Sequence, residues 1–178
     1  MSIISSPRTC HSCYRQFPSG AMECPRCRQS LGMAPPRAQS GALPWRIGRC
    51  GNLRVLLVTS RRRNRWILPK GWQAAGRSSA ASAEREAFEE AGIIGTIGQE
   101  PLGSYRYLKQ RDGAADLLCE VEIYGLKVRG TLINWREKGQ RKRKWCSMPE
   151  AISLIDEPGL KQLLLRLDVA GLSFNLAA

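Results

Sequence analysis

The pattern of apolar residues along the chain predicts three strands. The nearly continuous, β-branched run LRVLLVTSR at 53–61 predicts a buried strand, and WILP at 66–69 predicts a second strand beyond a basic turn. Residues 115–128 alternate between apolar and polar side chains, which predicts a third strand. The alternation places Cys119, Val121 and Ile123 on one face of the strand and Glu120, Glu122 and Tyr124 on the other face.

The longest helical pattern lies between residues 78 and 92. Ser78 or Ser79 can cap its amino terminus, and Gly92 readily adopts the left-handed conformation that ends a helix. Small side chains recur on one sector, so we expect this helix to lie close against another element: Ala80, Ala83, Ala87 and Ala91.

Two further helices are predicted near the carboxyl end. Ser147 and Glu150 have the spacing of a capping box, so a short helix is expected to begin there. A closing helix is expected after the break at Pro158 and Gly159. Its leucines recur at helical spacing and form an apolar face: Leu160, Leu163, Leu164 and Leu167.

The composition favours one main domain that is strongly basic. The 178 residues suffice for one substantial core, and the net charge of +13 favours phosphate-rich partners. We expect a small polyphosphorylated substrate. Nucleic acid is an alternative that is not favoured, because the basic residues are scattered through patterned segments. No apolar run approaches the roughly 20 residues of a membrane span, so we expect no membrane partner and a soluble, cytoplasmic protein.

The amino-terminal residues contain two CxxC pairs separated by ten residues. Two such turns can complete a tetrahedral thiolate shell, so residues 8–31 are expected to form a zinc-ribbon-like segment around a structural Zn²⁺. Two disulfides or four free thiols are the alternatives, and a reducing compartment disfavours the disulfides. Residues 32–40, rich in Pro, Gly and Ser, predict a linker to a main domain at 41–170. The predicted zinc ligands are Cys10, Cys13, Cys24 and Cys27.

Acidic side chains gather on one side of the helix predicted at 78–92. Glu86, Glu89 and Glu90 share a sector, because offsets of three and four residues return to one helix face. Each like-charged pair costs a few tenths of a kcal/mol unless a cation is present. Oxygen ligands suit Mg²⁺ or Mn²⁺, so these glutamates are predicted metal ligands. Arg85 can pair with Glu89, whereas Glu84 points elsewhere and is expected to be solvated.

Residues 71–93, GWQAAGRSSAASAEREAFEEAGI, resemble the Nudix box. The family pattern is Gly, five residues, Glu, seven residues, then Arg-Glu-aliphatic-any-Glu-Glu-any-Gly-aliphatic. One departure is plain: Arg77 stands at the first glutamate, a change that bears on the rate but leaves the helical carboxylates in place. The resemblance implies an α/β fold, with an α/β/α sandwich around a mixed sheet, and a hydrolase acting on phosphorus-containing acid anhydrides. It also implies the catalytic residues: Arg85, Glu86, Glu89 and Glu90.

Segments outside the box are similar to the diphosphoinositol polyphosphate phosphohydrolase branch of this family: WILPKGW, GSYRY and NWREKGQRKRKWCSMPEA. The similarity implies Mg²⁺-dependent hydrolysis of a phosphoanhydride in a polyanionic substrate, such as a diphosphoinositol polyphosphate or a dinucleoside polyphosphate. The arginines at 61–65 are predicted phosphate ligands, although a solvated hairpin tip explains them equally well. The full set of predicted phosphate contacts is Arg61, Arg63, Lys70, Arg141 and Arg143.

The predicted reaction is metal-assisted attack of water on a phosphorus atom. Members of the family draw the general base from the box or from a later strand or loop, so Glu86, Glu120 and Glu122 all remain candidates.

Two other functions remain alternatives for this chain. A zinc knuckle before a Nudix domain resembles the NADH pyrophosphatases, which cleave dinucleotides, but the Ser-Gln-Pro-rich stretch of those enzymes is absent beyond the box. The second alternative is a catalytically weakened Nudix domain that binds RNA or a protein. Arg77 and the net charge motivate it, whereas the costly acidic cluster argues against it.

Overall fold

The computed structural model describes residues 8–9, 16–17, 35–111 and 114–169. The chain divides into two compact units, Met1–Pro35 and Pro36–Ala178. In the first unit, β1 (Arg8–Thr9) pairs antiparallel with β2 (Gln16–Phe17). The four cysteines predicted to bind zinc lie outside the described residues, so the zinc-ribbon-like segment stays a prediction.

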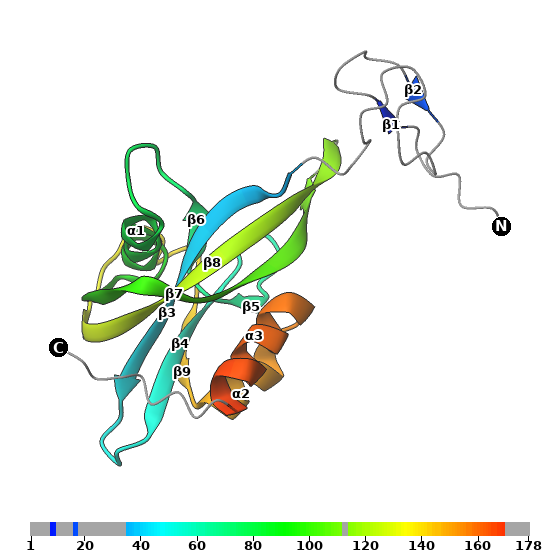
Figure 1. The fold of residues 1–178 in the computed structure, drawn as a ribbon. Helices are drawn as coiled ribbons and strands as arrows, with labels where there is room; N and C mark the ends of the chain where they lie inside the picture. The colour runs from blue at the N-terminus through cyan, green and yellow to red at the C-terminus, as the bar shows by residue number, and fades with distance from the viewer. Residues whose placement is uncertain (1–7, 10–15, 18–34, 112–113, 170–178) are drawn as a thin grey trace. The chain divides into compact units, whose positions relative to one another are not determined.

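A mixed β-sheet forms the centre of the second unit (Figure 1). The strand order is β5-β4-β3-β8-β7, with β6 pairing with β3 and β9 pairing with β4. β3 and β8 run parallel, and the other pairs are antiparallel. The strands are β3 (Arg37–Ile47), β4 (Leu53–Thr59), β5 (Trp66–Ile67), β6 (Lys70–Trp72), β7 (Ile93–Arg111), β8 (Ala114–Thr131) and β9 (Arg143–Cys146).

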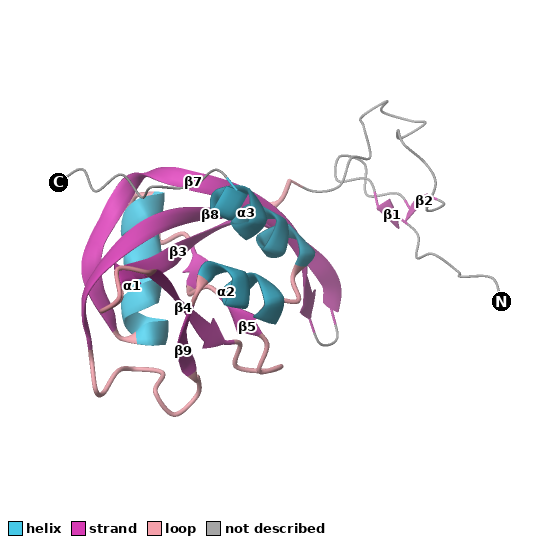
Figure 2. Ribbon diagram, turned by 90° about the horizontal axis from the view of Figure 1, so that it is seen from below, coloured by secondary structure: helices cyan, strands magenta, loops and turns pink. Residues whose placement is uncertain are grey.

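Helices cover both faces of this sheet. α1 (Ser79–Ala91) lies on one face, and α2 (Met148–Leu154) and α3 (Pro158–Val169) lie on the other, as Figure 2 shows. The predicted α/β arrangement, helices on either side of a mixed sheet, is confirmed for this unit. No helix in the described part of the chain is both long and apolar enough to cross a membrane.

Each face of the sheet has its own core. On the α1 face, the four alanines predicted to line a close contact are all buried, and Leu56 and Tyr124 pack with them. On the other face, the four leucines of α3 are buried with Val121 and Ile123 of β8. The sequence predicted both apolar helix faces correctly, because small and large residues recur at helical spacing.

The main unit begins earlier than predicted. β3 starts at Arg37 and pairs with both β8 and β6, so the last four residues of the expected linker belong to the sheet. Pairing with a strand about 80 residues away extends β3 through Pro/Ser-rich sequence whose local composition favours a loop.

Candidate active site

The caps of α1 fix the position of the acidic side chains. The Ser78 hydroxyl accepts a hydrogen bond from the Ala81 amide at 3.1 Å, which confirms the predicted amino-terminal cap. Gly92 ends the helix at φ 60°, in the left-handed conformation. With the alanine face against the sheet, Glu86, Glu89 and Glu90 lie along a cleft.

This cleft has a volume of about 1000 Å³ and brings together most of the predicted site. Its walls come from β3, the β4–β5 turn, β6, α1, β7 and the loop before β9. Among the predicted residues it contains Arg61, Arg63, Lys70, Glu86, Glu89, Glu90 and Arg141.

Gly71 lies directly against Glu86. A Cβ atom at position 71 would sit 2.3 Å from the carboxyl carbon of Glu86, which is closer than a Cβ atom can approach, so the Glu86 side chain would have to move. Gly71, at the start of the box, therefore leaves the space that the Glu86 carboxylate occupies. Burial, and then the charge of Glu89, raise the pKa of Glu86 above its ordinary value.

Glu90 lies in the cleft wall and is only 6% exposed. Its carboxylate accepts hydrogen bonds from the Lys70 amide, at 3.2 Å, and from the guanidinium of Arg141. Burial raises the pKa of Glu90 to about 7, although Arg141 opposes the shift.

Glu89 is held by two arginines. The Arg85 side chain contacts one of its oxygens at 2.8 Å, as predicted from their spacing, and Arg136 contacts the other oxygen at 2.8 Å. Glu86 differs, because no arginine forms an ion pair with it within the part of the chain that the structure describes.

Arg141 bonds to protein groups on three sides. It donates to the Thr59 carbonyl at 2.8 Å, to Glu137 at 2.5 Å and to Glu90. Its side chain is only 5% exposed. Predicted as a phosphate contact, Arg141 is thus placed as an internal counter-ion for two carboxylates.

Glu137 is a cleft residue that the sequence pattern did not single out. Its carboxylate bonds to Arg141 and lies 3.7 Å from Arg61, and its charge acts on both Glu86 and Glu90. It lies in a loop without hydrophobic periodicity, so only its place in the box-flanking segment at 134–151 could have drawn attention to it.

Lys70 reaches towards the other side of the cleft. Its Nζ donates to the Tyr107 hydroxyl at 2.6 Å and to the Gln39 amide oxygen at 3.1 Å. Burial lowers the pKa of Lys70 to about 8. A phosphate nearby would favour the charged form of this amine.

Arg143 is not brought to the cleft. Its guanidinium donates to the carbonyls of Ala91, at 2.7 Å, and Leu132, at 3.2 Å, and lies 3.7 Å from the ring centroid of Trp135. A cation at the carboxyl end of α1 suits the unpaired carbonyls there. The structure thus gives Arg143 a helix-capping position rather than the predicted phosphate contact.

The other candidate groups also lie elsewhere. Glu120 and Glu122 line a separate, smaller pocket of about 340 Å³, away from the box carboxylates. Arg77 is exposed on the turn before α1 and is absent from the lining of the main cleft. The change at the first box position therefore places no cation among the carboxylates.

The donor chemistry of the cleft fits a hard divalent cation. Glu86, Glu89 and Glu90 offer only oxygen ligands, which Mg²⁺ and Mn²⁺ favour. In the described residues, however, no three acidic, cysteine or histidine side chains converge enough to hold an ion. Arginines pair with two of these glutamates instead: Arg85 and Arg136 with Glu89, and Arg141 with Glu90.

Comparison with known proteins shows the family. The NUDIX domain family matches residues 47–167, so the chain belongs to that family. Nudix hydrolase 12, mitochondrial, of Arabidopsis thaliana is 30% identical over 133 residues, covering 66% of this chain and 66% of that protein. Diphosphoinositol polyphosphate phosphohydrolase 3-beta of Bos taurus is 32% identical over 126 residues, covering 68% and 73%.

A solved structure supports the same fold. The C. elegans Ap4A hydrolase superposes with a TM-score of 0.59 at 21% identity, over 76% of this chain and 98% of that one. The family match and the hydrolases among the relatives confirm the expected enzyme class, a Nudix-type hydrolase acting on phosphorus-containing acid anhydrides. The predicted cytoplasmic location stays a prediction, and several relatives carry mitochondrial or chloroplastic names.

Proposed function

We propose that this chain hydrolyses a phosphoanhydride in a polyanionic substrate, either a diphosphoinositol polyphosphate or a dinucleoside polyphosphate. The observation that carries the proposal is a single cleft in which the box carboxylates lie beside Arg61, Arg63 and Lys70. Cations around an acidic centre attract a phosphate chain and leave the carboxylates to hold a metal ion. Relatives of this chain include an enzyme named for diphosphoinositol polyphosphates.

In this proposal the box carboxylates bind a divalent metal ion that activates water. Mg²⁺ or Mn²⁺, typical of Nudix hydrolases, would lower the pKa of a bound water and offset charge on the phosphate. Glu86, Glu89 and Glu90 would hold the ion, and Arg85 would orient Glu89.

The proton of the attacking water needs an acceptor in the same cleft. Because Glu120 and Glu122 line another pocket, the candidates lie among the carboxylates of the main cleft: Glu86, Glu89, Glu90, Glu137 and Glu157.

A substrate panel tests the proposal. Phosphate release should be measured from diphosphoinositol polyphosphates, dinucleoside polyphosphates and NADH, each with Mg²⁺, Mn²⁺ and EDTA. We expect metal-dependent turnover that disappears in the double variant Glu89→Gln/Glu90→Gln and persists in Glu84→Gln, whose side chain lies outside the cleft lining. Full activity in the double variant contradicts the assignment. Silence across the panel, with tight and salt-sensitive RNA binding, supports the binding-module alternative.

We also propose that Cys10, Cys13, Cys24 and Cys27 bind a structural Zn²⁺. Their spacing supports the proposal, since two CxxC turns complete a closed tetrahedral shell. Metal analysis of the purified chain should give one zinc per molecule, lost on replacing Cys10 and Cys13 with serine. No zinc, together with four freely reactive thiols, refutes it.

A further inference from the structure

A chain of contacts orders the residues along the cleft. Arg61 contacts Glu137, Glu137 bonds to Arg141, and Arg141 bonds to Glu90. The series continues from Glu90 to the Lys70 amide, and from the Lys70 amine to the Tyr107 hydroxyl. Glu90 therefore lies between an arginine-rich end, at the β4–β5 turn, and a second end formed by β6 and β7.

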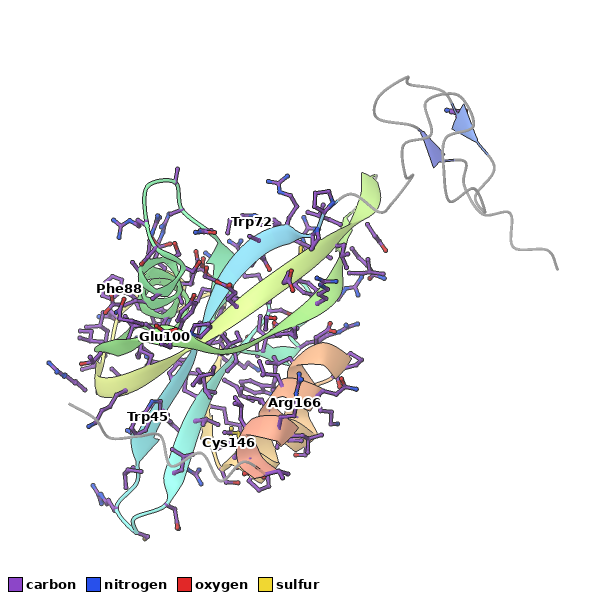
Figure 3. All side chains as sticks on the ribbon, viewed as in Figure 1. Trp45, Trp72, Phe88, Glu100, Cys146 and Arg166 are labelled. Carbon is purple, nitrogen blue, oxygen red and sulfur yellow. The ribbon has the colours of Figure 1, made fainter. Side chains whose placement is uncertain are left out.

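The second end is aromatic. Trp72 follows Lys70 on β6, lines the cleft and keeps 40% of its surface exposed, and Figure 3 shows it beside β3. Tyr107 and Leu108 of β7 also line the cleft. Large aromatic surface left open inside a charged cleft marks a place for a planar, apolar group.

Cations accompany the exposed indole. The Lys109 amine lies 4.5 Å from the centroid of the Trp72 ring, and the Arg37 guanidinium lies 5.4 Å from it. A cation–π contact at an exposed site is weaker than stacking of a nucleobase on an aromatic ring. A base can therefore displace one of these flexible side chains from the ring, and the released cation remains available to a phosphate.

We propose that Trp72, with Tyr107 and Lys109 beside it, forms a stacking site for a nucleobase, which makes a nucleoside polyphosphate the preferred substrate. This inference rests on the proposed function, because it chooses between the two substrate classes named there. The polyphosphate chain would extend past the box carboxylates towards Arg61 and Arg63.

An inositol polyphosphate matches this end of the cleft poorly. Its ring carries phosphates around the whole edge, so cations recognise it, and the Trp72 indole beneath Lys109 and Arg37 adds nothing to that recognition. A nucleoside polyphosphate is instead aromatic at one end and anionic along the rest, which is the order of groups along this cleft.

Binding measurements in EDTA test the inference without turnover. Isothermal titration of the full chain should compare diadenosine tetraphosphate with two base-free ligands, inorganic tripolyphosphate and inositol hexakisphosphate. The variants are Trp72→Ala and Trp72→Phe, with Phe88→Ala as the matched control. Phe88 is a similarly exposed aromatic residue, 48% against 40%, that Figure 3 shows on α1 and that lies outside the cleft lining.

We expect Trp72→Ala to weaken binding of diadenosine tetraphosphate about tenfold or more and binding of the base-free ligands less than about twofold. Trp72→Phe should retain most of the affinity, and Phe88→Ala should change none of the three. The inference is overturned if the wild type fails to bind diadenosine tetraphosphate in EDTA. Equal weakening of all three ligands in Trp72→Ala, or no weakening, also overturns it.

Turnover assays separate this inference from the proposed function. If the wild type binds the dinucleotide through Trp72 but releases no phosphate with Mg²⁺ or Mn²⁺, the proposed hydrolysis fails and the stacking site stands. If phosphate is released but neither binding nor KM depends on Trp72, the stacking site alone fails.

Discussion

The guanidinium of Arg141 bonds to the carboxylate of Glu90 in the cleft wall, where the two side chains are 5% and 8% exposed. A charged pair removed from water in this way is sensitive to loss of either partner, since the remaining charge is left buried and uncompensated. Glu137 shares the same arginine, so three charges from α1 and the loop before β9 depend on one another.

Loss of this arginine should destabilise the fold. We expect Arg141→Ala to lower the free energy of unfolding by about 3–5 kcal/mol, measured by urea denaturation. Arg136→Ala removes an ion pair of which the arginine side chain is 67% exposed, so it should cost about 0–1 kcal/mol. Similar small losses in both variants would show that Arg141 is not the counter-ion described.

Gly71 should be important for activity. An added methyl group would meet the Glu86 carboxylate at 2.3 Å, so the Gly71→Ala variant must displace that side chain. We expect metal-dependent turnover to fall about tenfold or more, while circular dichroism stays unchanged. Gly130→Ala is the control, because a methyl group there meets nothing within 4 Å. Wild-type turnover in Gly71→Ala would contradict the placement of Glu86.

The metal-free protein should gain stability when Glu86 becomes neutral. The fold raises the pKa of Glu86, so its stabilising contribution is complete below the ordinary value of 4.5 and is lost as the pH rises through the folded-state pKa. In EDTA at pH 8, Glu86→Gln should raise Tm by roughly 2–4 °C, and the gain should vanish near pH 4. A gain that is equal at both pH values would point to packing rather than charge. Glu84→Gln on the same helix is the control.

Glu137 should support the site although it lies outside the box. Because it holds Arg141 against Glu90, Glu137→Gln should reduce metal-dependent turnover about 10–100-fold, as loss of a supporting carboxylate typically does. Kinetics at saturating Mg²⁺ would show whether kcat falls. An unchanged kcat would show that Glu137 does not support the site. Replacement of Glu120, which lies at the other pocket, provides the comparison.

Restoring the first box glutamate should change little. Arg77 is exposed on the turn before α1 and is absent from the cleft lining, so Arg77→Glu should alter kcat/KM by less than about twofold. A large gain in turnover would instead show that this position reaches the metal ligands during catalysis.

The box helix could be predicted from local sequence alone. Ser78 supplies its cap and Gly92 its left-handed end, and the spacing of alanines and glutamates separates a buried face from an acidic one. All of these signals operate within one or two turns of helix, where neighbours in sequence are neighbours in space. The same holds for the leucine face of α3.

Tertiary structure decided what each cation does. Arg141 and Arg143 are two residues apart in one basic run, yet one bonds to buried carboxylates and the other caps α1. Glu137 and Trp72 reached the cleft through contacts between segments far apart in the chain. Sequence by itself determined the acidic helix and its family. The role of each charged side chain depended on which buried polar group lay close enough to pair with it. These contacts form only when the strands and loops pack together.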